Sequence, residues 1–230
     1  MLPQNRAVKS KWMKYAPQYY WGDDLDVRYY LLEQLRQLHG KKILDLGCGP
    51  GVILSEIPED NERFGIDISK ESLDFAKKVQ GNEKTNFILG TVTGLPFQAN
   101  SFDVLICANA VPGVDYAIDG NIESRQEEMF SEIVRVLKKG GTLYLSTPNG
   151  AHPYFQKKSK MKMARLETLL KKFFGSNYEI FGYKPIPLPK ILRSKILAKI
   201  PGVERWLYSQ AKNPRYKNSG WYFYVEAIKK

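Results

Sequence analysis

The sequence predicts an α/β protein with a doubly wound, Rossmann-like sheet, and three observations predict it. A glycine-rich turn directly follows a short apolar run at residues 42–46. Strand-like and helix-like patterns then alternate as far as residue 149. A carboxylate, Asp67, ends the second predicted strand. Strands that alternate with helices form a parallel sheet covered on both faces, so their carboxyl ends meet along one edge.

The elements follow one another with recognisable boundaries. An aromatic N-terminal segment precedes a helix that begins at Asp23 or Asp24 and runs to about His39, where Gly40 ends it. The predicted strands are 42–46, 63–67, 86–89, 102–107, 142–147, 178–183 and 221–228. The predicted helices after Gly40 are a short one following Gly51, one of about 70–79 capped by Ser69, one of about 123–137, and a basic one of about 160–174.

Two of these helices carry specific expectations. In the helix after Ser69, the residues Leu73, Ala76 and Val79 are spaced to face inward. The helix that ends at Leu137 is followed by the segment 138–141, two lysines and two glycines, which is typical of a helix C-terminus.

The size and composition predict one domain over residues 1–230. We divide it into an N-terminal aromatic and helical cap at 1–39, a cofactor-binding core at 40–149 and a basic C-terminal part at 150–230. The last part holds an insert at about 184–220 that is too long for a hairpin and is expected to be a lid or an extra packing layer. Its amphipathic basic pattern leaves a position on a membrane surface open.

Composition excludes several classes of protein. The longest apolar runs are too short to span a bilayer, and the N-terminus lacks the apolar core of a secretory signal. The two cysteines, Cys48 and Cys107, form neither a disulfide framework nor a zinc site, so no metal is predicted. These features predict a cytoplasmic protein, with peripheral attachment to a membrane left open.

Charge is distributed unevenly along the chain. Residues 1–150 carry 17 Lys and Arg against 20 Asp and Glu, a balance of −3, whereas residues 151–230 carry 18 against 4, a balance of +14. The net +11 therefore belongs to the last part of the chain. A basic surface attracts phosphate-rich partners, which include RNA, anionic lipid and a phosphorylated substrate.

The turn at residues 47–51 indicates the ligand. Its glycines are spaced G-x-G-x-G, whereas a dinucleotide fingerprint needs a third glycine where this chain has Val52. We expect Asp45 to orient the turn through hydrogen bonds to its N–H groups. Asp67, twenty positions after Gly47, is placed to accept both hydroxyls of a ribose. A nicotinamide dehydrogenase is therefore disfavoured, and a nucleoside cofactor is favoured.

The chain resembles class I S-adenosylmethionine-dependent methyltransferases, in particular the group similar to ubiquinone-biosynthesis methyltransferases. Five stretches in order, within residues 40–149, carry the resemblance: 43–51, 65–69, 94–97 with 101–104, 132–141 and 146–149. The resemblance implies a seven-stranded sheet whose last strand is antiparallel, with a helical insert before it. It implies S-adenosyl-L-methionine as cofactor and S-adenosyl-L-homocysteine as product.

The resemblance also implies site residues. Gly47, Cys48 and Gly49 would line the amino-acid end of the cofactor, and Asp67 would hold the ribose. The other implied contacts are Ile68 on an adenine face, Thr91 and Val92 at the adenine edge, and Cys107, Ala108 and Asn109 near the sulfonium.

Two positions depart from the pattern of many relatives. Thr91 stands where an aspartate is common, so backbone contacts to adenine must contribute more. The segment 109–113 stands where an acidic residue and a histidine are common, so no acid/base role is carried over to it.

The catalytic residues remain open. A hydroxyl acceptor needs a base, and His152, just after the fifth strand, is the first candidate, followed by Asp115 and Tyr154. His39 is expected to be structural or exposed. The preferred function is methyl transfer to a small-molecule or lipid-linked acceptor, and the alternative is an RNA methyltransferase that uses the basic residues 151–230. A non-catalytic cofactor-binding scaffold is a third alternative.

Overall fold

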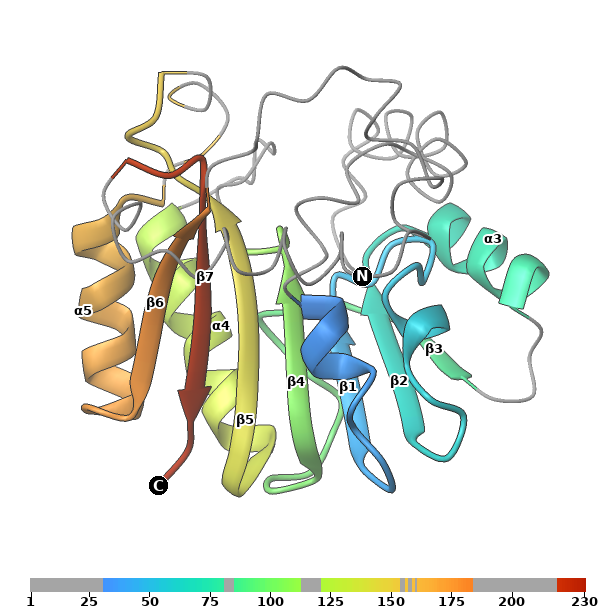
Figure 1. The fold of residues 1–230 in the computed structure, drawn as a ribbon. Coiled ribbons are helices and arrows are strands. Elements are labelled where there is room, and N and C mark those ends of the chain that lie inside the picture. The colour runs from blue at the N-terminus through green and yellow to red at the C-terminus, as the bar shows by residue number, and fades with distance from the viewer. Residues whose placement is uncertain are drawn as a thin grey trace, which may run out of the picture.

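A computed structural model describes residues 31–80, 85–112, 121–153, 156, 159, 161–183 and 219–230, which form a sheet with helices on both faces (Figure 1). The strands are β1 (Lys42–Leu46), β2 (Glu62–Asp67), β3 (Thr85–Leu89), β4 (Phe102–Ala108), β5 (Leu137–Pro148), β6 (Tyr178–Tyr183) and β7 (Tyr222–Ile228). The helices are the 3₁₀ turn η1 (Leu54–Glu56), α3 (Lys70–Gln80), α4 (Ile122–Val136) and α5 (Met163–Phe174), and residues 31–35 are also helical.

The described strands lie in the order β3-β2-β1-β4-β5-β7-β6. Neighbours among β1 to β5 pair in parallel, and β7 runs antiparallel to both β5 and β6. This confirms the predicted Rossmann-like sheet of seven strands with an antiparallel last strand. The chain changes direction across the sheet between β1 and β4, and ligands of open α/β sheets bind at the carboxyl ends of such a pair.

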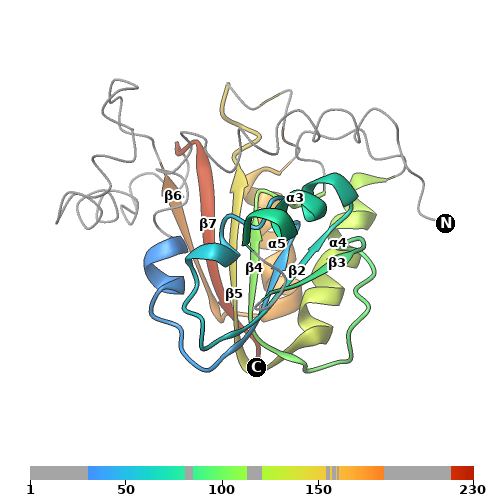
Figure 2. The same cartoon turned by 90° about the vertical axis from the view of Figure 1, so that its right-hand side faces the viewer.

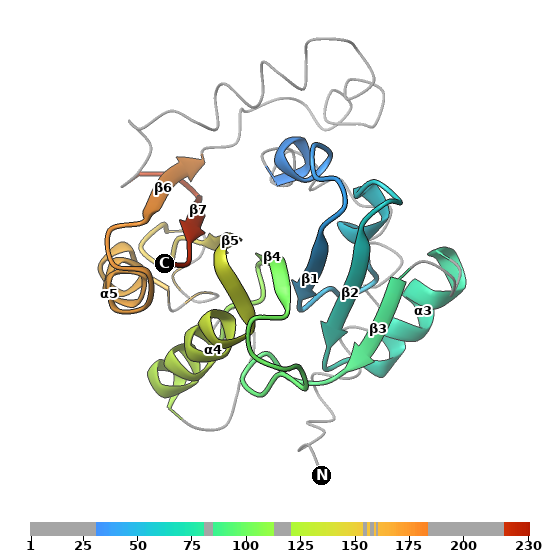
Figure 3. The same ribbon diagram turned by 90° about the horizontal axis from the view of Figure 1, so that it is seen from below.

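Two apolar clusters fill the two faces of the sheet. On one face, α4 and α5 bury residues such as Phe130, Leu169 and Leu105 against the strands. On the other face, the helical segment 31–35, η1 and α3 pack with Ile43 and other strand residues. Figures 2 and 3 show α4 and the segment 31–35 on opposite sides of the sheet. The sheet is therefore fixed from both sides, and its carboxyl edge presents the turns that follow the strands.

The junction between α4 and β5 differs from the prediction. The helix ends at Val136, and Leu137 is already extended and pairs with Phe102 of β4. Lys138 forms an ion pair with Asp103 at 2.9 Å instead of interacting with the C-terminus of the helix. The Gly140 N–H donates to Lys229 O. The segment predicted as a helix stop is thus the first part of a longer strand, because β4 and residue 229 offer it partners.

Two smaller expectations were also wrong. Val79 is 38% exposed, because α3 lies at the β3 edge of the sheet, where less of the helix is covered (Figure 1). The first helix ends at Leu35 and not at His39. The chain after it forms a tighter turn, since the Leu38 N–H donates to Leu35 O. The Leu38 carbonyl then accepts a hydrogen bond from the Asn61 side-chain amide.

Several predicted features lie outside the described residues. These are the aromatic N-terminal segment, the helix start at Asp23 or Asp24, and residues 184–218 of the insert. Within the part of the chain that is described, no helix has the length and apolar content needed to cross a membrane.

The loop after β3 is fastened to α4 by an ion pair. Arg135 donates to Glu132 Oε1 at 2.6 Å and to the carbonyl oxygens of Leu95 and Phe97. Glu132 Oε2 accepts from the Leu95 N–H at 2.6 Å. The hydrogen bonds from Arg135 lower the pKa of the Glu132 carboxyl, against a smaller opposing effect of burial. The ionised pair thus holds the loop that leads from Thr91 to β4.

Replacing Glu132 is expected to change how stability depends on pH. Because the pKa of Glu132 is lowered in the folded state, its contribution is present above the unfolded-chain value of about 4.3 and is lost as pH falls through the folded value. Glu132→Gln should therefore cost about 1–3 kcal/mol of unfolding free energy at pH 7 and clearly less at pH 3. Urea unfolding at both pH values measures this. Glu128→Gln, an exposed change on the same helix, is the control, and an equal cost for Glu132→Gln at both pH values would contradict the expectation.

Candidate functional site

The glycine turn after β1 is folded onto the end of β2. The Gly47 and Cys48 N–H groups both donate to Ile66 O, at 2.8 and 3.1 Å, and the Gly51 N–H donates to Cys48 O at 2.9 Å. The Gly49 N–H donates to Asp67 Oδ2 at 2.8 Å. Parallel pairing of β1 with β2 places the end of β2 beside these N–H groups. Asp45 is buried at the end of β1, and its expected role in orienting the turn stays a prediction.

Asp67 connects the two turns at the carboxyl edge. Its Oδ2 accepts from Gly49, and its Oδ1 accepts from the Ser69 N–H at 2.8 Å. Desolvation raises the pKa of the Asp67 carboxyl, and N–H donors from Ser69, Gly49 and Ile68 oppose that rise. Each carboxylate oxygen keeps further acceptor capacity. The group is thus oriented by the backbone and still able to accept hydroxyl donors.

Gly47 and Gly49 of the turn are required to be glycine for different structural reasons. Both have positive φ, +69° at Gly47 and +52° at Gly49. A Cβ added to Gly47 would lie 2.3 Å from Ala110 Cβ, whereas a Cβ added to Gly49 would meet no atom of the described residues within 4 Å. The first glycine is required by packing against the segment after β4. The second leaves the turn open on one side, as close approach of a ligand to the backbone requires.

Apolar surface lies beside the carboxylate. Ile68 directly follows Asp67 and is 56% exposed, and Leu89, the register partner of Asp67 at the end of β3, is 47% exposed. Large apolar side chains at adjacent strand ends suit the flat face of a heterocycle. Sequence reasoning had named Ile68 but not Leu89, whose place at a strand end was the available signal.

The predicted adenine-edge residues lie in the turn after β3. Thr91 Oγ1 accepts from the Thr93 N–H at 3.3 Å and shares a hydrogen bond with Thr93 Oγ1 at 3.0 Å. The Thr91 hydroxyl thus forms hydrogen bonds within its own turn. Val92 is partly buried and packs against the core on the α4 side.

Two predicted site residues at the end of β4, Cys107 and Asn109, have different surroundings. Cys107 is fully buried in the core on the α4 side, and burial raises its pKa to about 12, so its thiol is inert and contributes packing. Asn109 has φ +59°, and its N–H donates to Ser146 O at 2.9 Å. Among the described residues, no group lies within hydrogen-bonding distance of its buried Oδ1 atom.

Cys48 is the second thiol of the site. Its side chain is buried below the turn, and a Cβ added to Gly65 would lie 2.7 Å from its Sγ. Burial, together with the charges of Asp45 and Asp67, raises the pKa of the Cys48 thiol. The side chain therefore packs beneath the turn as part of the core cluster.

Of the three candidate bases, the structure describes only His152. The His152 ring lies 4.8 Å from the Trp221 ring, with a 34° angle between the planes. His39 pairs with Asp60 at 3.0 Å and is exposed, as expected of a residue outside the chemistry. Asp115 and Tyr154 lie outside the described residues.

Asn149 is a residue that sequence reasoning quoted without a role. It is 2% exposed, its Nδ2 donates to Gly220 O at 2.9 Å, and its Oδ1 accepts from the Ala151 N–H at 2.9 Å. Its own N–H donates to Trp221 O. This side chain joins the end of β5 to the start of β7, 71 residues away, and a local sequence pattern cannot show such a partner.

The residues present fit an adenosine-bearing cofactor. An oriented carboxylate, an exposed apolar side chain and an open glycine backbone lie together at the point where the order of the sheet reverses. The fold and this site define a nucleoside-cofactor domain of the Rossmann-like class.

The comparisons with known proteins then place the chain. The family described as a methyltransferase domain matches residues 38–193, which is more than half of the chain. The chain belongs to this methyltransferase family, which confirms the predicted class.

Relatives and solved structures agree with this placement. An uncharacterised protein of Methanocaldococcus jannaschii is 28% identical over 85% of this chain and 83% of its own length. The ubiquinone biosynthesis O-methyltransferase of Vibrio cholerae is 26% identical over 52% of this chain, and the chain spans 47% of that enzyme, about half its length. A biotin biosynthesis bifunctional protein of Teredinibacter turnerae is matched over 22% of its own length.

One solved structure extends the comparison of folds. The phosphoethanolamine N-methyltransferase 2 of Haemonchus contortus, solved with S-adenosylhomocysteine, has a TM-score of 0.65 at 18% identity, covering 100% of this chain and 59% of that chain. At this identity the likeness concerns the fold alone.

Adding a methyl group at Gly49 is expected to impair cofactor binding selectively. Gly49→Ala places a Cβ on the open side of the turn and should weaken S-adenosylhomocysteine binding roughly tenfold or more, a loss of about 1.4 kcal/mol. The control is Gly140→Ala, because Gly140 also has positive φ (+73°) and no atom of the described residues within 4 Å of its added Cβ, but lies at the opposite end of β5. Both changes should cost about 1 kcal/mol of stability through backbone strain. Calorimetric titration that finds equal affinity for both variants would contradict the assignment of the open side to the cofactor.

Proposed function

We propose that the protein transfers a methyl group from S-adenosyl-L-methionine to a small-molecule or lipid-linked acceptor. The observation that carries this proposal is the hydrogen bond from the Gly49 N–H to the Asp67 carboxylate at 2.8 Å. It joins the glycine turn of β1 to the acid that ends β2, at the edge where a nucleoside cofactor binds in such sheets. Family membership supports the reaction class.

The proposal assigns roles to the residues around the turn. The backbone of residues 47–49 would bind the amino-acid part of the cofactor, and Asp67 would accept from the ribose hydroxyls. Ile68 would cover one face of the adenine, while Thr91 and Val92 would meet its edge through their backbone. Because its thiol is buried, Cys107 would contribute only backbone contacts beside Asn109.

The bound cofactor supplies an activated methyl group on a sulfonium. The main work of the chain is then to hold a nucleophile in line with that methyl group, at roughly 3–3.5 Å. Asn109, whose N–H is bonded to Ser146 O, would lie beside that methyl group. The stacking of His152 on Trp221 supports a role in shaping the acceptor side, and no base is assigned.

The acceptor side is formed where the basic part of the chain joins the sheet. Pro148, Tyr183 and Tyr222 are register neighbours at the end of β5, the end of β6 and the start of β7. The ends of β5 and β6 and the start of β7 therefore lie along the carboxyl edge that holds the glycine turn (Figure 1). The part from 151 onward carries the charge of +14, which supports an acceptor with a phosphate or carboxylate, free or in a lipid headgroup. A lipid-linked acceptor would bring the protein to a membrane surface.

The same charge supports RNA as an alternative acceptor. Phosphates along an RNA strand would be attracted by the basic residues from 151 onward, and aromatic side chains of that part would stack on unpaired bases.

Removing the Asp67 carboxylate should abolish most of the cofactor affinity. Asp67→Ala is expected to weaken S-adenosylhomocysteine binding about ten- to hundredfold, because charge-assisted hydrogen bonds of about 1.5–3 kcal/mol are lost. Asp74→Ala removes the same charge from an exposed position on α3 and should leave the affinity unchanged. Isothermal titration calorimetry measures both. An unliganded native protein, or an Asp67→Ala variant with native affinity, would sink the cofactor assignment.

The acceptor is tested by transfer of a labelled methyl group. The native protein is incubated with labelled S-adenosylmethionine and, separately, with a lipid extract, total RNA and a small-molecule extract. We expect label in the lipid or small-molecule fraction, with Asp67→Ala as the inactive control. Label found in RNA, and lost after ribonuclease treatment, would replace the preferred acceptor by the alternative.

A further inference from the structure

A buried glutamine connects α4 to the segment after β4. Gln126 is 1% exposed, and both ends of its amide are engaged. Its Nε2 donates to Pro112 O at 2.9 Å, and its Oε1 accepts from Arg165 Nε at 3.1 Å. A polar side chain is stable in such a place only with partners for its donors and acceptors. Gln126 is therefore a two-ended link between a loop carbonyl and a cation.

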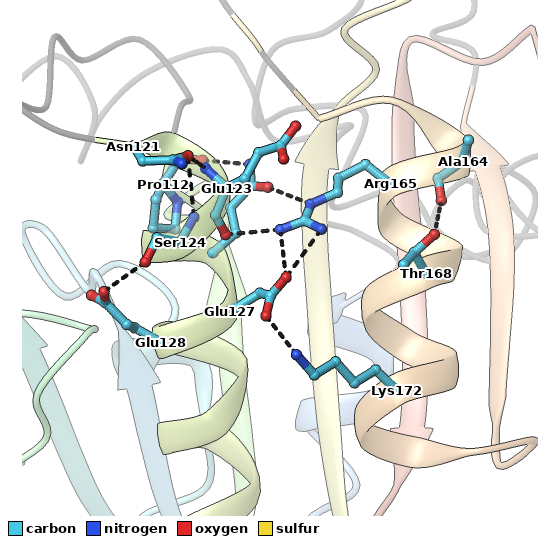
Figure 4. Close-up of polar contacts among 11 residues, drawn as sticks. Pro112, Asn121, Glu123, Ser124, Glu127, Glu128, Ala164, Arg165, Thr168 and Lys172 are labelled. Atoms are coloured by element: carbon cyan, nitrogen blue, oxygen red, sulfur yellow. Dashed lines mark hydrogen bonds and ion pairs between the residues drawn. The ribbon is translucent and has the colours of Figure 1, made fainter.

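Arg165 brings that cation from α5, in the basic part of the chain. One terminal nitrogen donates to Glu123 O at 2.8 Å, and both terminal nitrogens lie 3.4 Å from Glu127 Oε1. Figure 4 shows Arg165 reaching from α5 to Glu123 and Glu127 at the start of α4, with Lys172 on the other side of Glu127. A planar guanidinium serves these acceptors together, which a lysine ammonium cannot reproduce.

The segment held by Gln126 packs against the cofactor turn. It begins at Asn109, whose N–H donates to Ser146 O, and continues with Ala110. Ala110 fills the space that a side chain on Gly47 would need, with 2.3 Å between its Cβ and a Cβ built there. Pro112 ends the segment as far as it is described, and Gln126 fixes the Pro112 carbonyl. Pro112 therefore lies two residues from the side chain that packs against the glycine turn.

We propose that Gln126 and Arg165 are positioning residues, which hold residues 109–112 against Gly47 and so set the geometry of the cofactor turn; the role in catalysis rests on the proposed function. Through them α5 is connected to the site by a chain of contacts: Arg165 to Gln126, Gln126 to Pro112, and Ala110 to Gly47. Neither side chain is placed among the predicted cofactor contacts.

A competing explanation is that the network only packs α5 against α4. Gln126→Glu separates the two explanations. The carboxylate keeps an acceptor for Arg165, so the contact between the helices is preserved, but it has no donor for Pro112 O. A role confined to helix packing predicts no change around residues 109–112 in this variant.

The experiment compares hydrogen exchange and cofactor affinity in Gln126→Glu and in a control. We expect exchange of the Asn109 and Ala110 amides to accelerate about tenfold, because a local opening equilibrium shifts by that order when a buried hydrogen bond is lost. Affinity for S-adenosylhomocysteine should fall about three- to tenfold, the range of mutations that act through a contact network. Lys172→Met breaks the neighbouring ion pair with Glu127 and should leave both quantities at native values.

The outcomes are distinct. Native exchange at Asn109 and Ala110 in Gln126→Glu would overturn the proposal, and so would changes of equal size in Lys172→Met. If Gln126→Glu does not fold, Arg165→Lys carries the same comparison, since one ammonium cannot hold Gln126, Glu123 and Glu127 together. If the native protein binds no S-adenosylhomocysteine, the proposed function fails, and the exchange comparison alone still decides whether Gln126 positions the segment.

Discussion

The site depends on how the turn after β1 is held by the end of β2. One carbonyl, Ile66 O, accepts two N–H groups of that turn, and the carboxylate of the next residue, Asp67, accepts a third. A glycine-rich turn has many conformations in a free chain, and fixing them costs conformational entropy. The strand end supplies the acceptors that select one conformation. Parallel pairing of β1 with β2 is therefore the condition for the cofactor turn to have a defined shape.

A second constraint comes from α4, which holds the loop after β3 and the segment after β4. Near its C-terminal end, Glu132 and Arg135 bind the backbone of Leu95 and Phe97, in the loop after β3. Near its N-terminal end, Gln126 binds Pro112, after β4. In the proposed site, the first loop would lie on the adenine side and the second on the acceptor side. One rigid helix thus sets their distance, so the site does not depend on loop residues alone.

The sequence predicted the elements well where the signal was local. Apolar runs gave the bounds of β1, β2 and β6 to within one residue, and the glycine spacing distinguished this turn from a dinucleotide turn. It was misleading where a distant partner decides the outcome. Segment 138–141 resembles a helix stop, yet pairing with β4 and Lys229 makes it a strand. Cys107 stays a predicted contact near the sulfonium, and strand alternation turns its thiol into the core, which leaves its backbone for that contact. The Gln126 and Asn149 contacts join residues 14 and 71 positions apart, beyond any local pattern.

The antiparallel strand β7 has a consequence for how such an enzyme changes during evolution. Because Tyr183 and Tyr222 are register partners, the chain between β6 and β7 begins and ends at neighbouring points of a finished sheet. Closing a longer chain between fixed points costs only about 0.6 kcal/mol for each doubling of its length. Segments of other lengths and charges can therefore be exchanged at this place without disturbing the strands that hold the methyl donor. Substrate preference is then free to diverge while the chemistry is inherited unchanged.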